Sequence, residues 1–157
     1  MSGNPGPSPA GGAAPRRDLA AMVVPLARAL VAAEEPVLRA HQVSMWGYVV
    51  LNALAEQPVR TQAALAQSIG ADKSRIIAVL DELQRHGLIE RRPDPDDRRV
   101  HLLALTEAGR RRRESVRAAI QRLEEERVLA VLPEADRAAF IRALRTLSEL
   151  PPEDIRG

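Results

Sequence analysis

The segment between residues 61 and 105 constrains the fold more than any other part of the chain. Thr61 is placed to cap a short helix, which ends at the tight break Ile69–Ala71. Asp72 then caps a longer helix, and Gly87 stops it just after His86. Two helices joined by a turn of about three residues that contains glycine are typical of a helix-turn-helix.

The second of these helices has two distinct faces when its residues are spaced at about 100° each. The stripe expected to be buried consists of Ile76, Val79, Leu80 and Leu83. The opposite face consists of Ser74, Arg75, Ala78, Asp81, Glu82 and Arg85, with Lys73 and Ile77 at the flanks. This face is small near its start, as a helix that enters the major groove of DNA requires. Asp81 would be repelled by phosphates there, and we expect it to pair with Arg85 one turn later.

A β-hairpin is predicted directly after Gly87. Residues 88–92 and 98–105 suit strands, and the intervening segment Pro93–Asp97 is dense in turn-forming residues. A hairpin tipped with arginine that follows the second helix of a helix-turn-helix is a wing.

Helices are predicted on both sides of this segment. Residues 18–40 have helical apolar spacing, with a kink or a late start expected at Pro25 and Pro36. Residues 43–56 are apolar around most of the helix circumference, so this helix should be central.

Two more helices are expected after the hairpin. Thr106 is placed to cap a long helix over about 107–131, and Pro133 suits the first turn of a final helix that ends near Leu150. The expected fold class is therefore mainly α with a small β-hairpin wing, an α+β winged helix-turn-helix with a helical region from both termini.

Composition narrows the function classes. Of 157 residues only Trp46, Tyr48 and Phe140 are aromatic, so the core must come from aliphatic residues, which favours helices. The absence of cysteine excludes a disulfide framework and fits a reducing cytosol. No apolar run is long enough to span a membrane, and residues 1–17 read as a disordered tail rich in proline and glycine. We therefore expect a cytoplasmic protein without membrane contact.

Charge alone does not indicate a nucleic-acid partner. The net charge is only +2, and the basic run Arg110–Arg113 equally suits a solvated helix face. The expectation of DNA binding therefore rests on the architecture.

The wing residues resemble those of the multiple-antibiotic-resistance regulator (MarR) family. The segment Asp94–Arg99, followed by Leu105–Gly109, is similar to the family's wing signature of an acidic turn, Asp-x-Arg and a strand that ends in Leu-Thr. The helix-turn-helix fits as well, through Leu65, Ala66, Gly70, Leu83 and the segment Gly87–Ile89. The resemblance covers about residues 19–150.

This resemblance implies a homodimer within a domain over 18–157. Residues 18–42 and 107–150 would form the dimerisation helices, and 43–106 the DNA-binding region. The apolar residues expected to serve the dimer are Val116, Ile120, Leu123, Val128, Val131, Phe140, Ile141, Leu144 and Leu147. Twofold symmetry then implies a palindromic operator in double-stranded DNA, bound by a repressor that an effector releases.

Roles in DNA binding follow by position. Lys73, Ser74 and Arg75 would enter the major groove, where Arg75 suits guanine O6 and N7. Thr61 and Gln62 would donate to phosphate, and Arg98 at the wing tip would reach the minor groove. Arg99 is expected to pair with Asp97 or another acid, and which wing arginine touches DNA stays open. Many family members have Thr-Arg where this chain has Ile77-Ala78, so specificity should depend on residues 73–75.

The resemblance also implies a cleft for a small aromatic or anionic effector. The residues near its expected place are His41, Met45, Trp46, Tyr48 and Asn52. Ordinary core packing is the competing interpretation of these side chains, and the sequence favours it.

Other function classes have little support. His41, His86 and His101 lack the spacing of a metal site, and the acidic wing turn lacks the full calcium-loop pattern. No catalytic grouping has supporting context, so we expect no enzyme and no cofactor. The alternative from another class is a winged-helix protein-interaction module without DNA binding.

Overall fold

The computed structural model describes residues 16–57 and 60–156, without the side chains of Arg60 and Lys73. Most of the predicted tail over 1–17 lies outside these residues. The chain divides into two compact units, Met1–Ala32 and Ala33–Gly157. In the described part of the first unit, α1 (Leu19–Ala40) begins and exposes apolar side chains such as Leu19 and Val31. The helix includes both Pro25 and Pro36, so it has no late start.

The second unit contains the predicted helix-turn-helix. Before this motif lies α2 (Met45–Glu56), capped by the Ser44 hydroxyl, which accepts a hydrogen bond from Gly47 N at 3.1 Å. The two helices of the motif follow it. The next helix, α3 (Gln62–Ile69), is capped by Thr61, as predicted. It ends at Gly70 with φ of 63°, a conformation that favours glycine.

The second helix of this motif is α4 (Lys73–Arg85). Asp72 caps it by accepting a hydrogen bond from Arg75 N at 2.8 Å, which confirms the predicted start. Its predicted apolar stripe is buried, and Ile76 and Leu80 are almost fully enclosed.

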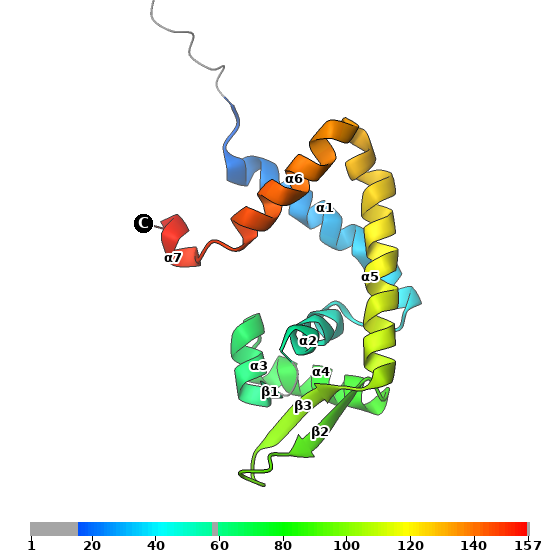
Figure 1. Ribbon diagram of the computed structural model, residues 1–157, viewed down its shortest axis with the longest axis vertical. Helices are drawn as coiled ribbons and strands as arrows, with labels where there is room; N and C mark the ends of the chain where they lie inside the picture. The colour runs from blue at the N-terminus through cyan, green and yellow to red at the C-terminus, as the bar shows by residue number, and fades with distance from the viewer. Residues whose placement is uncertain (1–15, 58–59, 157) are drawn as a thin grey trace, which may run out of the picture. The chain divides into compact units, whose positions relative to one another are not determined.

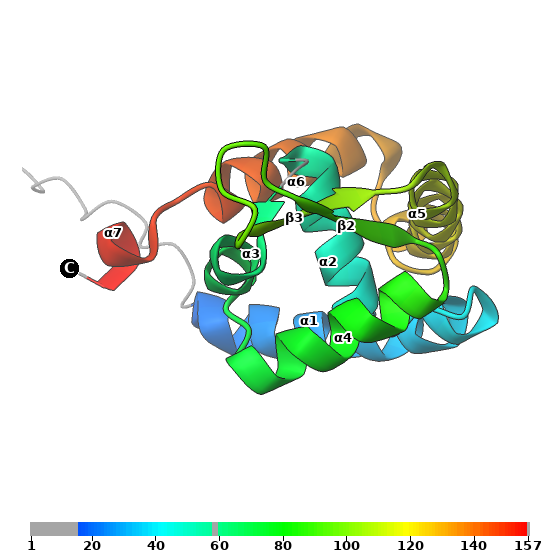
Figure 2. The same cartoon turned by 90° about the horizontal axis from the view of Figure 1, so that it is seen from below.

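The predicted wing consists of β2 (Ile89–Pro93) and β3 (His101–Leu105), paired antiparallel from Ile89–Leu105 to Pro93–His101. A third strand, β1 (Arg60–Thr61), pairs with the other edge of β3, so the sheet order is β1-β3-β2. Figure 2 looks at α4 and the hairpin from below, and both lie on the same side of this unit.

The helix α5 (Glu107–Arg127) starts where the sheet ends. Thr106 caps it, as predicted, and donates a second hydrogen bond to Gly87 O at 2.6 Å. Gly109 lies so close to the start of β2 that a β-carbon there would be 2.0 Å from Leu88 O. This close approach explains why glycine stands in the first turn of the helix.

The remaining elements follow α5. The helix ends at Arg127, earlier than predicted, and a 3-10 turn (Leu129–Val131) comes next. It is followed by α6 (Glu134–Ser148) and by α7 (Pro152–Arg156), which the sequence analysis did not predict.

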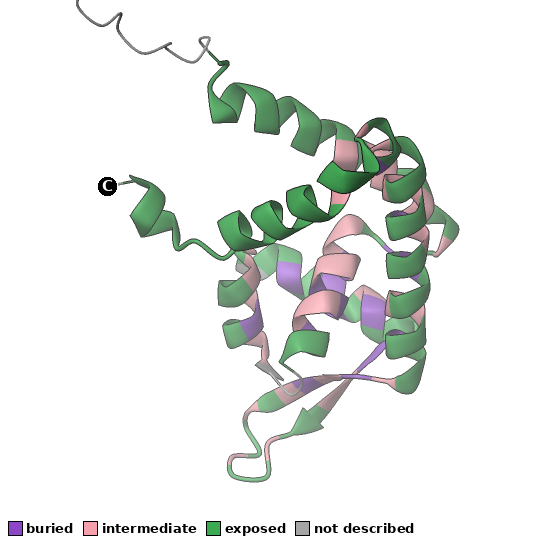
Figure 3. Cartoon of the chain, turned by 45° about the horizontal axis from the view of Figure 1, so that its top comes forward, coloured by how far each residue is buried: buried purple, intermediate pink, exposed green. Residues whose placement is uncertain are grey.

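The core lies between the helix-turn-helix, the sheet and α5. Its fully enclosed members include Leu51, Leu54, Leu65 and Leu103 (Figure 3). Val116 and Ile120 belong to this core, with 0% and 6% of their surface exposed. Both were expected to face a partner subunit, and that expectation was wrong because their helix face packs on the chain's own core. By contrast, α6 has no buried residue.

Candidate nucleic-acid interface

The outer side of α4 has small exposed side chains near its start, at Ser74 and Ala78. Ser74, Ala78 and Arg85 are exposed there, and Lys73 begins the helix. Ile77, at the flank of this side, is a large apolar side chain that is 39% exposed. This side therefore allows the close backbone approach that groove reading requires.

Arg75 lies at the flank of α4 rather than at its outermost edge. Its guanidinium carbon is 5.1 Å from the centre of the Trp46 ring on α2. Its Nε is 3.8 Å from Asp72 Oδ2, and 51% of its side chain is exposed. The residue expected to contact guanine is therefore accessible and lies near both Trp46 and Asp72.

Asp81 does not pair with Arg85 as expected. Its Oδ1 accepts a hydrogen bond from Arg91 Nη2 on β2 at 2.8 Å. The reason is the proximity of β2 to α4, which brings a cation from ten residues away closer than the one on the next helical turn. This ion pair joins α4 to β2 of the wing, and Arg85 is exposed.

Within the wing tip, Asp97 and Arg99 form the pair that was expected. Arg99 donates from its backbone N and from Nε to Asp97 Oδ1, at 3.0 Å and 3.1 Å, and from Nη2 to Oδ2 at 3.2 Å. The Arg99 side chain and then its backbone N–H lower the pKa of Asp97. The pair therefore persists at neutral pH and is lost only as the pH falls through this lowered pKa.

Arg98, between the two members of this pair, is exposed. Among the described residues none forms a hydrogen bond or an ion pair with its side chain. Arg98 thus lacks an ion-pair partner among the described residues, whereas Arg99 pairs with Asp97 although its side chain is 91% exposed.

Thr61 and Gln62 lie where β1 passes into α3, and both are half-buried. Thr61 Oγ1 already accepts a hydrogen bond from Ala64 N at 3.2 Å, and its backbone pairs with Leu102. A hydroxyl that accepts a hydrogen bond in a helix cap still has its own O–H group as a donor.

The basic run at the start of α5 is used within the chain. Arg111 pairs with Glu107 at 3.2 Å, and Arg112 donates to His41 O. Arg113 donates from Nε to Asn52 Oδ1 at 2.8 Å and pairs with Glu114. Arg113 thus joins α5 to α2, and Arg112 joins it to the residue after α1, whereas Arg111 is exposed and pairs within α5, as on a solvated helix face.

The five residues expected near an effector cleft do not converge. Trp46 contacts Arg75, whereas His41 binds Val37 O at 2.8 Å and Ser115 Oγ at 3.1 Å. Met45 and Tyr48 pack against the core. Asn52 alone lines a described cavity, of about 510 Å³, with Val49, Ala53, Glu56, Ser68 and Ile69.

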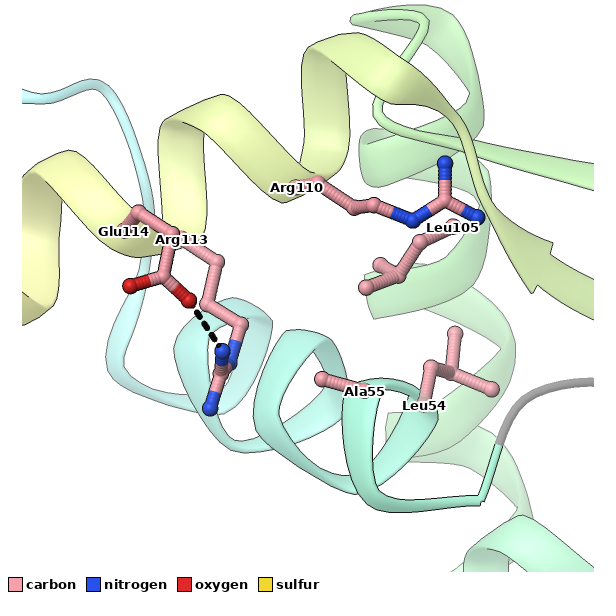
Figure 4. A pocket seen from close by; sticks show the side chains of 6 residues that line it. All are labelled: Leu54, Ala55, Leu105, Arg110, Arg113 and Glu114. Atoms are coloured by element: carbon pink, nitrogen blue, oxygen red, sulfur yellow. Dashed lines mark hydrogen bonds and ion pairs between the residues drawn. The ribbon is translucent and has the colours of Figure 1, made fainter.

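A second cavity, of about 350 Å³, lies between α2, α5 and the end of β3 (Figure 4). Its lining combines apolar Leu54, Ala55 and Leu105 with Arg110, Arg113 and Glu114. The guanidinium of Arg113 is turned toward Glu114, as the dashed line indicates. Apolar walls beside two guanidinium groups are chemically suited to an aromatic acid.

Neither a metal cluster nor a membrane span is found in the described part of the chain. Its His, Asp and Glu side chains form no group of three or more that could hold a metal ion. None of its helices is both long enough and apolar enough to cross a bilayer.

A protein-family model described as the MarR family matches residues 43–101, which include the helix-turn-helix and most of the wing. The putative transcriptional regulatory protein for the hcr operon of Thauera aromatica is 33% identical over 100 residues. That match covers 64% of this chain and 60% of the relative's length.

Solved structures match over more of the chain. The PcaV transcriptional regulator of Streptomyces coelicolor, in complex with its natural ligand, is 31% identical with a TM-score of 0.60, covering 87% of this chain and 98% of that one. CouR, a repressor from Rhodococcus jostii bound to a 23-mer DNA duplex, is 26% identical with a TM-score of 0.70, covering 83% and 92%.

Proposed function

Because this chain belongs to the MarR family of winged-helix transcriptional regulators, we propose that it binds DNA sequence-specifically as a homodimeric repressor of transcription. Its proposed ligand is a palindromic operator in double-stranded DNA, and the cytoplasm is the proposed location because the operator lies there. Catalysis has no part in this function.

One observation carries the proposal: α4 and the wing lie on the same side of one unit with a common core. The outer face of α4 has small side chains near its start, and Arg98 of the wing has no ion-pair partner among the described residues. The ion pair between Asp81 and Arg91 holds these two elements together. A helix in the major groove and an arginine in the neighbouring minor groove require this fixed spacing.

The roles of the side chains follow from their surroundings. Lys73, Ser74 and Arg75 stand at the start of α4, where a reading helix contacts base edges. Arg98 is the minor-groove contact, because Arg99 is engaged by Asp97. Thr61 and Gln62 lie at the start of α3, where side-chain and backbone donors suit a phosphate.

The proposed dimer is supported by α6. Its apolar side chains are exposed although they share one helix face, as Phe140, Leu144 and Leu147 are 36%, 47% and 56% exposed. Monomeric proteins rarely leave so continuous an apolar face in water. We therefore divide the domain over 18–157 into dimerisation helices, 18–42 and 107–150, and a DNA-binding region, 43–106.

Release by a small aromatic or anionic effector is the proposed means of regulation. One cavity is lined by Asn52 and the other by Arg113, and they lie on two sides of α2. Arg113 Nε donates a hydrogen bond to Asn52 Oδ1, so the two cavities are connected through this bond. An acid that competes for Arg113 would break this bond and shift α2 against α5. Of the residues first expected to bind an effector, Met45 and Tyr48 pack against the core, His41 is hydrogen-bonded to Val37 O and Ser115 Oγ, and Trp46 contacts Arg75. Asn52 supports the site best.

A gel-shift titration with the DNA upstream of the protein's own gene tests the function. We expect specific binding that weakens steeply with salt. Arg98→Ala should weaken binding to most sequences and lower the salt slope by about one per subunit. Arg111→Ala, which removes the same charge from a paired and distant arginine, is the matched control.

The alternative, a winged-helix module that binds another protein, predicts a different result. Binding to specific and random duplexes would then be equally weak, and Arg98→Ala would behave as Arg111→Ala does. This outcome would rule out the proposed function.

A further inference from the structure

The contact between Trp46 and Arg75 joins α2 to α4, the helix proposed to enter the major groove. Trp46 is the only tryptophan of the chain and lies half-buried in the first turn of α2. The guanidinium carbon of Arg75 is 5.1 Å from the centre of its ring, within the distance of about 6 Å at which a cation is attracted to an aromatic face.

Helix geometry explains why Arg75 reaches the ring. At about 100° per residue, Arg75 is only about 40° from Val79 around α4, and Val79 belongs to the buried stripe. The stem of Arg75 therefore runs along the border between the core and the solvent. Asp72, one turn before it, has its Oδ2 at 3.8 Å from Arg75 Nε.

Both contacts leave the hydrogen-bond donors of Arg75 free. The separation from Asp72 is longer than a hydrogen bond, and the ring attracts the cation without accepting a directed N–H bond. Among the described residues no acceptor takes a hydrogen bond from the guanidinium group. About half of the side chain is exposed, so an outside ligand has access to this group.

We propose that Trp46 is a positioning residue that holds Arg75 in the orientation in which it binds guanine O6 and N7 in the operator. This inference rests on the proposed function. An arginine that is already ordered loses less conformational entropy when it forms a bidentate contact than a mobile one does. Trp46 therefore increases specific affinity without touching DNA itself.

Binding measurements with graded variants test the proposal. The probe is a duplex selected by the wild-type protein from a randomised pool, together with the same duplex carrying 7-deazaguanine, which lacks N7. Trp46→Leu should lower specific affinity by about threefold per subunit, or about tenfold for a dimer, and Trp46→Phe should lose less. Tyr48→Phe, on the same helix but without contact to Arg75, is the control.

A double-mutant cycle separates positioning from general damage to the fold. In an Arg75→Ala background, Trp46→Phe should have no further effect on binding, because the arginine it positions is gone. Discrimination against the 7-deazaguanine duplex should fall from the wild type through Trp46→Phe to Trp46→Leu, in step with the loss of specific affinity. Thermal melting identifies any variant that is merely unfolded, and Trp46→Phe keeps an aromatic ring in the core.

Trp46 also gives a signal that requires no change to the ring. Its fluorescence should change with Arg75→Ala and stay constant with Arg85→Ala, which removes the same charge from the outer side of α4. It should change again when wild-type protein is titrated with the selected duplex.

The possible results distinguish the two proposals. If wild-type protein selects no duplex, the proposed function fails and this inference fails with it. If the wild type binds specifically but the Trp46 and Arg75 effects are additive, only the positioning role is overturned. Tighter binding by Trp46→Leu would also overturn it, because the ring would then be withholding Arg75 from DNA.

Discussion

The winged-helix region and α6 are both rich in aliphatic side chains, but they use them differently. Between Val43 and Leu105 the apolar residues of helices and strands meet one another, and members such as Val50 and Leu80 are fully enclosed. In α6 the apolar residues share one face of a well-formed helix, and none is buried. Helical periodicity thus predicts a face in both regions, but it does not say whether the covering surface belongs to the same chain.

This contrast is strongest in the expected response to Leu147→Asp. If a second copy covers α6, a dimer loses two buried leucines, which costs about 4 kcal/mol of association free energy. The monomer should keep its fold, because Leu147 is 56% exposed. Sedimentation across a concentration series measures the effect, and Thr146→Asp, away from the apolar face, is the control. An unchanged association constant would contradict the assignment of this face.

The opposite response is expected in the winged-helix region. Leu80→Ala should lower the free energy of unfolding by about 3 kcal/mol, because it leaves a cavity in the core. Ile77→Ala on the same helix, at a side chain that is 39% exposed, should cost far less. Urea denaturation measures both. Equal losses would mean that α4 is not packed as described.

A single added carbon tests how closely this region is packed. Gly109→Ala should lower the free energy of unfolding by about 2 kcal/mol, because the β-carbon would be 2.0 Å from Leu88 O. Helix propensity alone predicts the reverse, a gain of about 1 kcal/mol. The sign of the change in the free energy of unfolding therefore decides between the steric clash and helix propensity. Ala118→Gly, on the exposed side of α5, measures the propensity effect alone by thermal melting.

The smallest change in stability is expected from Glu124, near the C-terminal end of α5. Burial, and then the charge of Glu125, raises the pKa of Glu124; burial and Glu124 raise that of Glu34. A raised carboxyl pKa means that the folded state favours the protonated form, so stability is lost as the pH rises through it. Glu124→Gln should therefore stabilise the protein by less than about 1 kcal/mol at pH 7. The gain should vanish in acid, whereas exposed Glu126→Gln should show neither effect.

The sequence alone predicted the features that depend on neighbouring residues. Thr61, Asp72 and Thr106 each cap the helix that was predicted to start there, because a cap acts over three residues and leaves a recognisable spacing. The two wing strands and the buried stripe of α4 were predicted for the same reason, since period and turn residues are short-range properties. The Asp97–Arg99 pair also lies within one turn.

Only the tertiary structure decided which distant residues meet. Asp81 pairs with Arg91 instead of Arg85, and Arg75 rests on Trp46, because β2 and α2 pack against α4. The inward direction of Val116 and Ile120 has the same origin, as has the short strand β1. A sequence records the spacing of side chains along one element, whereas the partner across a contact depends on how elements far apart in the chain come together.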